Sequence, residues 1–315
     1  MDFTNSLAAF EPVGADMGEH GFARWKHHAS INGQLPVEFL LPRVRRRIRL
    51  AEIPFLTGPL RIPVGEFRER AASLAPWTYH VEVHGAFSMR EYGTYSDETV
   101  AFHRYRSALI SATVMDLLSS EAPNASVLDL ACNCGVFSLD LAQRGVGRVV
   151  GVDLRPENLA QAELLRRAYG IGNASFRQVN VKELGSETYD VVLNLGLMYH
   201  LSTPFEVMRA SFEATRRFCV VDTITHKEPF SAYFVNSKDT NIPLEGDLKF
   251  ELQPTYRGII ATMREAGFSF ILEVEGLCET NVTLYSDFSR RCLIGFRDDP
   301  RPYLKRLGAP KSALA

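Results

Sequence analysis

The chain has 315 residues, of which 46% are hydrophobic and 23% charged, so it can bury a sizeable core and is not a mainly disordered chain. Its 35 basic and 37 acidic side chains give a net charge of -2, which excludes a global basic field for nucleic acid or an anionic membrane. Five cysteines without a CxxC pair, no signal-peptide pattern in "MDFTNSLAAF" and no run of about 18 apolar residues predict a cytoplasmic chain that does not span a membrane.

Residues 1–120 are expected to form an N-terminal cap or adapter. The segment "RVRRRIRL" (43–50) carries five arginines, and nearby acids almost balance them, which favours a solvated helix or turn face over an anion or RNA contact. "PWTYHVEVHGAFS" then alternates like a strand, and "DETVAFHRYRSALISATVMDLLSS" has helical spacing with Asp97 as its expected cap.

Residues 121–300 alternate between strand-like and helical segments. The strand-like ones are "SVLDLA", "RVVGVDL", "ASFRQVN", "YDVVLNLG" and "RFCVVDT", followed after a break by "SFILEVEG" and "RRCLIGFR". This order predicts an α/β fold, a doubly wound, Rossmann-like, mostly parallel seven-stranded sheet with helices on both faces. The break at about 224–255 predicts a lid, with a packing insertion as the alternative, and 301–315 a C-terminal tail.

The stretch "SVLDLACNCGVFSLDLA" (126–142) has the layout of a nucleotide site, a short strand, a tight loop and a helix. Ala131, Asn133 and Gly135 stand where a dinucleotide fingerprint has glycines, and Asp129 would repel a pyrophosphate. An acid suits instead the cationic end of S-adenosylmethionine. Asp153, after the second strand, is expected to accept the ribose hydroxyls.

Further cofactor contacts are expected at the ends of the next strands. Asn180 can offer a donor and an acceptor to the adenine edge, although each of these polar groups alone can equally be a cap or turn residue. The predicted cofactor-binding set is completed by Cys132, Leu154, Val181, Leu195 and Tyr199. Cys132 and Cys134 form a CxC without a second ligand pair, so loop packing is favoured and no metal site is predicted.

The sequence resembles the class I S-adenosylmethionine-dependent methyltransferases over roughly residues 120–297. Within them it is similar to the tRNA wobble-uridine (cmo5U) carboxymethyltransferase group, through "VLDLACNCGVFSLDLA", "VLNLGLMYHLSTPFEVM", "HGAFS" and "FHRYR". In that group two lysines belong to the pocket for a carboxylated cofactor. His84 and His103 stand at the matching positions, and Ala131 replaces a glycine. Neutral histidine substitutes poorly for lysine, so ordinary S-adenosylmethionine is the expected donor.

Four residues are candidates for the chemistry of methyl transfer. The resemblance makes Tyr199 a pocket residue. It also places His84 and His103 facing the site, although each histidine alone can equally be a surface or core-edge residue. His200, after the fourth strand, is either a general base or a scaffold residue that hydrogen-bonds the backbone.

Three functions remain open from the sequence. The favoured one is methyl transfer to an O, N or S nucleophile of a small-molecule acceptor, in specialised metabolism. The resemblance and the arginine cluster support tRNA modification as the alternative, and the altered loop "ACNCG" allows a non-catalytic cofactor-binding protein.

Overall fold

The computed structural model describes residues 23–26, 38–41, 43–48, 56, 58–83, 87–88, 92–93, 96–237, 250–278, 285 and 289–307, of which 23–48, 82–88 and 276–278 are described by their backbone alone. Among these residues, no helix is long and apolar enough to cross a membrane.

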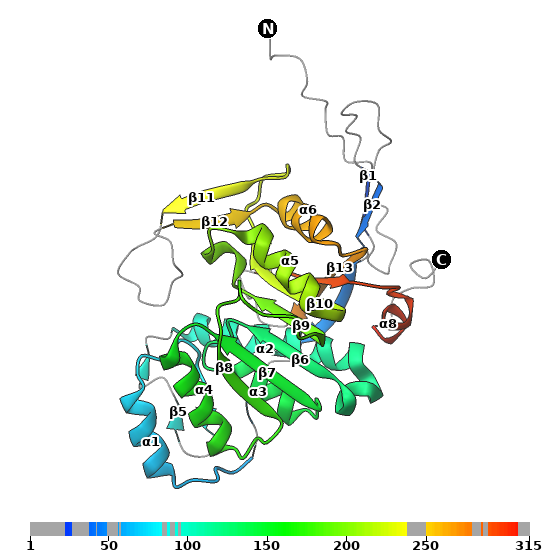
Figure 1. Ribbon diagram of the computed structural model, residues 1–315. Coiled ribbons are helices and arrows are strands. Elements are labelled where there is room, and N and C mark those ends of the chain that lie inside the picture. The colour runs from blue at the N-terminus through cyan, green and yellow to red at the C-terminus, as the bar shows by residue number, and fades with distance from the viewer. Residues whose placement is uncertain are drawn as a thin grey trace.

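A mostly parallel sheet forms the centre of the molecule (Figure 1). The order of its strands is β3-β13-β14-β10-β9-β6-β7-β8. All seven predicted strands are present: β6 (Ser126–Leu130), β7 (Arg148–Asp153), β8 (Ala174–Gln178), β9 (Tyr189–Leu195), β10 (Thr215–Ile224), β13 (Phe270–Cys278) and β14 (Arg290–Phe296). Only β14 runs antiparallel to its neighbours. The predicted α/β fold is therefore confirmed.

The central strands are continuous apolar runs because helices cover both of their faces. Every residue of β6 is buried, as are six of the seven residues of β9. A half-exposed strand would alternate between apolar and polar residues, whereas a strand buried on both faces is apolar throughout. The continuous apolar sequence of these strands therefore indicates that they lie in the middle of the sheet.

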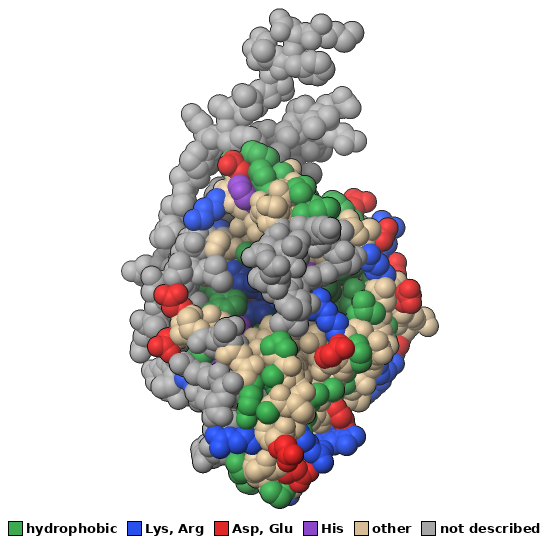
Figure 2. Space-filling view, turned by 90° about the vertical axis from the view of Figure 1, so that its left-hand side faces the viewer, with side chains coloured by type: hydrophobic (Ala, Val, Ile, Leu, Met, Phe, Trp, Pro, Cys, Tyr) green, Lys and Arg blue, Asp and Glu red, His purple; other side chains and the backbone are tan. Residues whose placement is uncertain are grey.

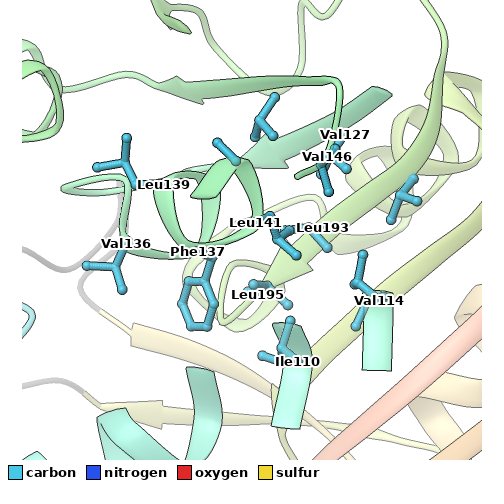
Figure 3. Packing of buried hydrophobic residues seen from close by; sticks show 14 of the residues in the cluster. Ile110, Val114, Val127, Val136, Phe137, Leu139, Leu141, Val146, Leu193 and Leu195 are labelled. Atoms are coloured by element: carbon cyan, nitrogen blue, oxygen red, sulfur yellow. The ribbon is translucent and has the colours of Figure 1, made fainter. Parts of the chain in front are cut away.

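Two helical layers enclose the sheet (Figure 1). On one face lie α1 (Val64–Ser73), α2 (Asp97–Leu118), α3 (Val136–Gln143) and α4 (Pro156–Ala168). On the other lie α5 (Pro204–Ala214) and α6 (Tyr256–Ala266). Figure 3 shows how the first layer packs, with Ile110 of α2 and Phe137 of α3 close to Leu195 of β9.

The N-terminal region contributes directly to the sheet. The arginine cluster, expected on a helix or turn, instead forms the edge strand β3 (Arg43–Ile48), which pairs in parallel with β13 and makes the sheet eight-stranded. Two further strand pairs involve the N-terminal region: β1 (Ala23–Lys26) with β2 (Glu38–Leu41), and β4 (Glu82–Val83) with β5 (Phe87–Ser88).

The helix predicted around residues 97–120 is present as α2, but its cap differs from the expected one. Ser96 is the N-cap, and its Oγ accepts a hydrogen bond from Thr99 N at 3.1 Å, so Asp97 is the first helical residue. The acidic Asp97 and Glu98 still lie in the first turn, where a negative charge favours the helix dipole.

The last elements lie in and beyond the predicted lid. The hairpin of β11 (Tyr233–Ser237) and β12 (Phe250–Pro254) occupies both sides of residues 238–249, which lie outside the described residues. The predicted tail contains α8 (Arg301–Arg306). An ion pair between Arg306 and Glu121 joins α8 to the 3-10 segment η3 (Ser119–Asn124). The domain boundaries at 120 and 300 stay predictions, and β3 and α8 both pack on the central domain.

Candidate active site

The candidate site lies where the strand order reverses. β7 and β8 follow β6 on one side of the sheet, whereas β9 and β10 lie on its other side. In open α/β sheets, ligands bind beyond the carboxyl ends of the strands at this point. The residues that follow β6, β7, β8 and β9 are therefore the candidates for ligand binding.

The loop after β6 has an unusual backbone. Ala131, Asn133 and Gly135 all adopt positive φ angles, of 52°, 52° and 75°. A Cβ atom on Gly135 would lie 2.6 Å from the Phe176 ring, so the loop needs glycine there for space as well as for its φ angle. The loop turns sharply into α3, whose N-cap is Gly135.

Asp129 is fully enclosed at the end of β6. Its exposed fraction is 1%, and its Oδ2 accepts a hydrogen bond from Ser138 Oγ at 2.7 Å. Burial raises the pKa of this carboxyl to about 7. Since a cation nearby would stabilise the charged form, Asp129 suits the positively charged end of a ligand, which stays a prediction.

Asp153 connects the loop to the end of β7. Its Oδ2 accepts a hydrogen bond from Asn133 N at 2.9 Å, and its Oδ1 accepts one from Arg155 N at 2.9 Å and one from Asn158 Nδ2 at 3.2 Å. The carboxylate therefore holds both strand-end loops in place. Its predicted contact with ribose hydroxyls needs an oxygen lone pair beyond these bonds, and a carboxylate has about four such sites.

The remaining predicted cofactor residues divide by exposure. Leu154 is 60% exposed, whereas Val181, Leu195 and Cys132 are buried. Asn180 follows β8, and its Oδ1 accepts a hydrogen bond from Lys182 N at 3.1 Å, so it acts as a turn residue whatever else it binds.

Cys132 and Cys134 are buried in the loop. Burial raises the pKa of both thiols, that of Cys134 to about 12, so neither is ionised near neutral pH. Across the described residues, no group of three or more His, Cys, Asp or Glu side chains has the arrangement of a metal site.

Tyr199 and His200 lie in the 3-10 turn η4 (Met198–His200), directly after β9. Their rings are 4.1 Å apart. His200 Nδ1 lies 3.6 Å from Glu251 Oε1, which belongs to β12 of the predicted lid, and Glu251 Oε2 accepts a hydrogen bond from Gln253 Nε2. The hairpin of β11 and β12 thus places a carboxylate beside the candidate base.

Of the two histidines at the lysine positions, His84 lies outside the described residues. His103 is buried in α2, with its ring 4.6 Å from that of Tyr79 and its Nδ1 accepting a hydrogen bond from His80 N at 3.4 Å. Burial, together with the charge of Arg106, lowers the pKa of His103 to about 3. A neutral ring at this position agrees with ordinary S-adenosylmethionine as the donor.

A charged cluster is buried next to these residues, and we call it the Asp222 cluster: Asp222, Arg106, Arg290, Tyr79 and Tyr285. Arg106 Nε and Arg290 Nε donate to Asp222 Oδ1 at 2.6 and 2.8 Å. Tyr285 donates to Asp222 Oδ2 at 2.5 Å, and Arg106 Nη1 donates to Tyr79 OH at 2.6 Å. Burial by itself raises the pKa of Asp222, but the two guanidinium groups bring that pKa below its ordinary value.

The two arginines of the cluster converge on Gly196, the residue after β9. A Cβ atom there would lie 3.1 Å from Arg106 Nη2, 3.1 Å from Arg290 Nη2 and 3.3 Å from Tyr199 OH. Gly196 has a φ of 70° and donates its N–H to Asp222 O at 2.7 Å. Gly196, the glycine in "LNLGLMYH", is therefore needed for its positive φ angle. It is also needed because a side chain there would crowd the two arginines and Tyr199.

Asp222, Arg290, Gly196 and Glu251 were not among the residues predicted from the sequence. Asp222 had a signal, since an acid inside the apolar run "RFCVVDT" requires a buried partner. Arg290 and Glu251 had no comparable signal in the sequence.

Residues 127–219 match the model of a methyltransferase domain family. Two curated relatives match the same part of the chain. The ubiquinone biosynthesis O-methyltransferase of Pseudomonas fluorescens (strain Pf0-1) is 36% identical over 93 residues, which are 29% of this chain and 39% of that protein. That of Acinetobacter baumannii (strain AYE) is 33% identical over 87 residues, 27% of this chain and 36% of the relative. The chain thus spans less than two fifths of these relatives, and neither is a wobble-uridine enzyme, so the finer resemblance stays a prediction.

Among solved structures, the N-terminal domain of EvdMO1 with SAH bound has the same fold. It superposes with a TM-score of 0.57 at 20% identity, covering 75% of this chain and 97% of that one. Residues 127–219 therefore lie in a methyltransferase domain, and the strand order of its sheet is that of the class I S-adenosylmethionine-dependent methyltransferase fold.

Proposed function

We propose that this chain transfers a methyl group to an O, N or S nucleophile of a small-molecule acceptor. The observation that carries the proposal is the juxtaposition of His200 with Glu251 at the end of β9, beside the strand-end acids of β6 and β7. The similarity to O-methyltransferases favours oxygen as the acceptor atom.

The residues at the ends of β6 and β7 fit S-adenosylmethionine. Asp129 and Asp153 present carboxylates where a pyrophosphate would be repelled and a cationic ligand is favoured. The cofactor, when bound, supplies a methyl group on a positively charged sulfur. Asp153 and the loop at 131–135 would hold its nucleoside, and Asp129 would lie toward its charged end.

His200 is proposed as the general base that takes the proton from the acceptor nucleophile. Its Nδ1 faces the Glu251 carboxylate, so Nε2, on the other side of the ring, is the nitrogen that accepts the proton. A carboxylate beside Nδ1 stabilises the imidazolium that forms and selects the ring orientation. Such a base contributes roughly a hundredfold to ten-thousandfold to the rate.

The test compares His200→Ala with the parent chain in two measurements. Production of S-adenosylhomocysteine is followed with a panel of small phenols, amines and thiols, and the affinity for S-adenosylhomocysteine is measured by calorimetry. We expect turnover to fall by at least about a hundredfold with an unchanged affinity. Unchanged turnover would remove His200 as the base.

Glu251→Gln tests the partner of His200. We expect a smaller loss of turnover and a shift in its pH profile, because the amide no longer stabilises the protonated ring. Glu228→Gln, an exposed change in the same insertion, is the matched control and is expected to have no effect.

The tRNA alternative predicts an extended basic surface. In the face that Figure 2 shows, basic and acidic side chains of the described residues are interspersed, which favours a small acceptor over a polyanion. Salt-sensitive binding of tRNA by the whole chain would reverse this preference. Binding of S-adenosylhomocysteine without turnover on any acceptor class would point to the non-catalytic alternative.

A further inference from the structure

The Asp222 cluster carries more positive than negative charge. Two guanidinium groups share one carboxylate, and the exposed fractions of the Arg106, Arg290 and Asp222 side chains are 4%, 5% and 0%. Burial by itself lowers the pKa of both arginines, yet the carboxylate and nearby tyrosines raise it above the ordinary value, so both stay charged. A buried excess positive charge is costly unless a second anion joins it.

The N–H groups that face this excess charge lack acceptors. Arg106 Nη2 and Arg290 Nη2 are both buried and have no hydrogen-bond partner among the described residues. Arg290 Nη2 lies 2.6 Å from Asp222 Oδ1 as an ion pair without hydrogen-bond geometry. Buried guanidinium N–H groups almost always have an acceptor, so two at one place mark a position that a ligand completes.

The two Nη2 atoms lie close to the same residue, Gly196. Each lies 3.1 Å from the position of a Cβ atom on Gly196, and Tyr199 OH lies 3.3 Å from it. Because residue 196 has no side chain, these three groups can approach its Cα atom closely, and they lie near one another. Planar guanidinium groups match the geometry of a carboxylate, which can accept from both arginines at once.

The two Nη2 atoms lie beside Gly196, at a different part of the sheet from the predicted nucleotide contacts. The strand-end acids Asp129 and Asp153 belong to β6 and β7, on one side of the switch point. Gly196 directly follows β9, and Asp222 and Arg290 belong to β10 and β14, on the other side. Tyr199 and His200 follow Gly196 directly. The site therefore lies on the side of the proposed base.

We propose that Arg106, Arg290 and Tyr199 form an oxyanion site beside Gly196, and that its ligand is the carboxylate of an acidic acceptor. The inference rests on the proposed function and narrows it, since it names the acceptor class as small carboxylic acids that carry a second, nucleophilic group. The carboxylate anchors the acceptor, and the nucleophile lies toward His200.

The first experiment uses the parent chain saturated with S-adenosylhomocysteine. Acetate and benzoate are titrated by calorimetry, with acetamide and benzamide as neutral controls of the same shape. We expect the acids to bind and the amides to bind at least about tenfold more weakly, because only the anions neutralise the two arginines. Equal binding of acids and amides, or binding of neither, would overturn the proposal.

Two variants locate the site. Arg290→Lys keeps a positive charge beside Asp222 but removes Nη2, and Tyr199→Phe removes one hydroxyl without changing charge. We expect each to lower the affinity for benzoate, the first by about tenfold or more. Arg297→Lys, just beyond the other end of β14, is the matched control, and its guanidinium bonds Thr215 O instead. Benzoate affinity that is unchanged in both site variants would contradict the assignment.

Binding measurements with the cofactor decide whether the carboxylate in the site belongs to the acceptor or to the cofactor itself. If the site holds a carboxylate of the cofactor, Arg290→Lys lowers the affinity for S-adenosylhomocysteine and acetate competes with it, or a carboxylated S-adenosylmethionine binds more tightly than the plain form. Either result overturns the assignment to the acceptor. If S-adenosylhomocysteine does not bind the parent chain at all, the proposed function fails, whereas the comparison of acetate with acetamide in the free protein still tests the oxyanion site.

Discussion

At the scale of single residues, the loop after β6 stores backbone strain. Ala131 has a φ of 52°, in the left-handed region that costs an L-residue about 1–2 kcal/mol. We expect Ala131→Gly to raise the free energy of unfolding by about 0.5 kcal/mol, since relief of strain exceeds the extra entropy of glycine in the unfolded chain. Urea denaturation measures this change. Ala142→Gly, in the regular helix α3, is the control and is expected to destabilise.

Asp129 makes stability depend on pH. Its pKa is about 7 in the folded state against an ordinary value near 3.8, so the folded state binds more protons than the unfolded state between these values. The free energy of unfolding therefore falls as pH rises from about 4 to 7, by up to about 4 kcal/mol from this group.

Asp129→Asn removes this dependence, because the amide has no proton to lose and its oxygen can still accept from Ser138 Oγ. We expect the variant to be more stable than the parent at pH 8 and similar to it at pH 4.5. Denaturation at both values checks the sign. A difference that does not change with pH would show that Asp129 titrates near its ordinary value.

At the scale of elements, Thr255 joins the hairpin of β11 and β12 to α6. Its Oγ1 accepts from Gly258 N as the N-cap of α6 and from Ala232 N, and it donates to Phe230 O at 2.5 Å. The residue is fully buried. One hydroxyl thus satisfies one backbone group of α6 and two of the segment before β11, and it belongs to the residue directly after β12, the strand that carries Glu251.

We expect Thr255→Val to lower the free energy of unfolding by about 2–3 kcal/mol, since it keeps the shape of the side chain but leaves buried N–H groups without an acceptor. Turnover should fall as well, because β12 positions Glu251. Thr255→Ser retains the hydroxyl and is expected to restore most of both. Thermal unfolding and turnover are measured on the parent chain and both variants. Equal results for Thr255→Val and Thr255→Ser would contradict this role of the hydroxyl.

At the scale of the whole molecule, helix α8 packs into the core. Leu304 of α8 is fully buried, Tyr303 OH accepts from Arg217 Nε at 2.8 Å, and Arg306 Nη1 donates to Leu117 O at 2.6 Å. These contacts tie α8 to β10 and to the end of α2, which carries Arg106 toward its other end.

We expect Leu304→Ala to lower the free energy of unfolding by about 2–5 kcal/mol, which is the cost of a cavity in a packed core. A residue of a solvated tail would cost close to nothing, so denaturant titration separates the two cases. Lys305→Ala, exposed on the same helix, is the matched control.

Most of the strands and helices of the domain could be predicted from the sequence, because their signals are local. The pattern of apolar residues within a single segment is enough to predict its element. This holds for the apolar runs of β6 and β9 and for the helical spacing of α4 and α6. The arginine-rich strand β3 could not be predicted, because an edge strand pairs on one side only and its composition resembles a charged helix face.

The sequence by itself determined the α/β fold and the acids at the ends of β6 and β7, since both depend on short stretches of chain. Only the tertiary structure brought together Arg106, Asp222 and Arg290, which are 116 and 68 residues apart in the chain and meet where α2 packs on the sheet and β14 pairs with β10. Likewise, His200 meets Glu251 only because β12 packs against η4. Periodicity and motifs report on neighbours in sequence, whereas the balance of buried charge depends on which distant strands lie side by side.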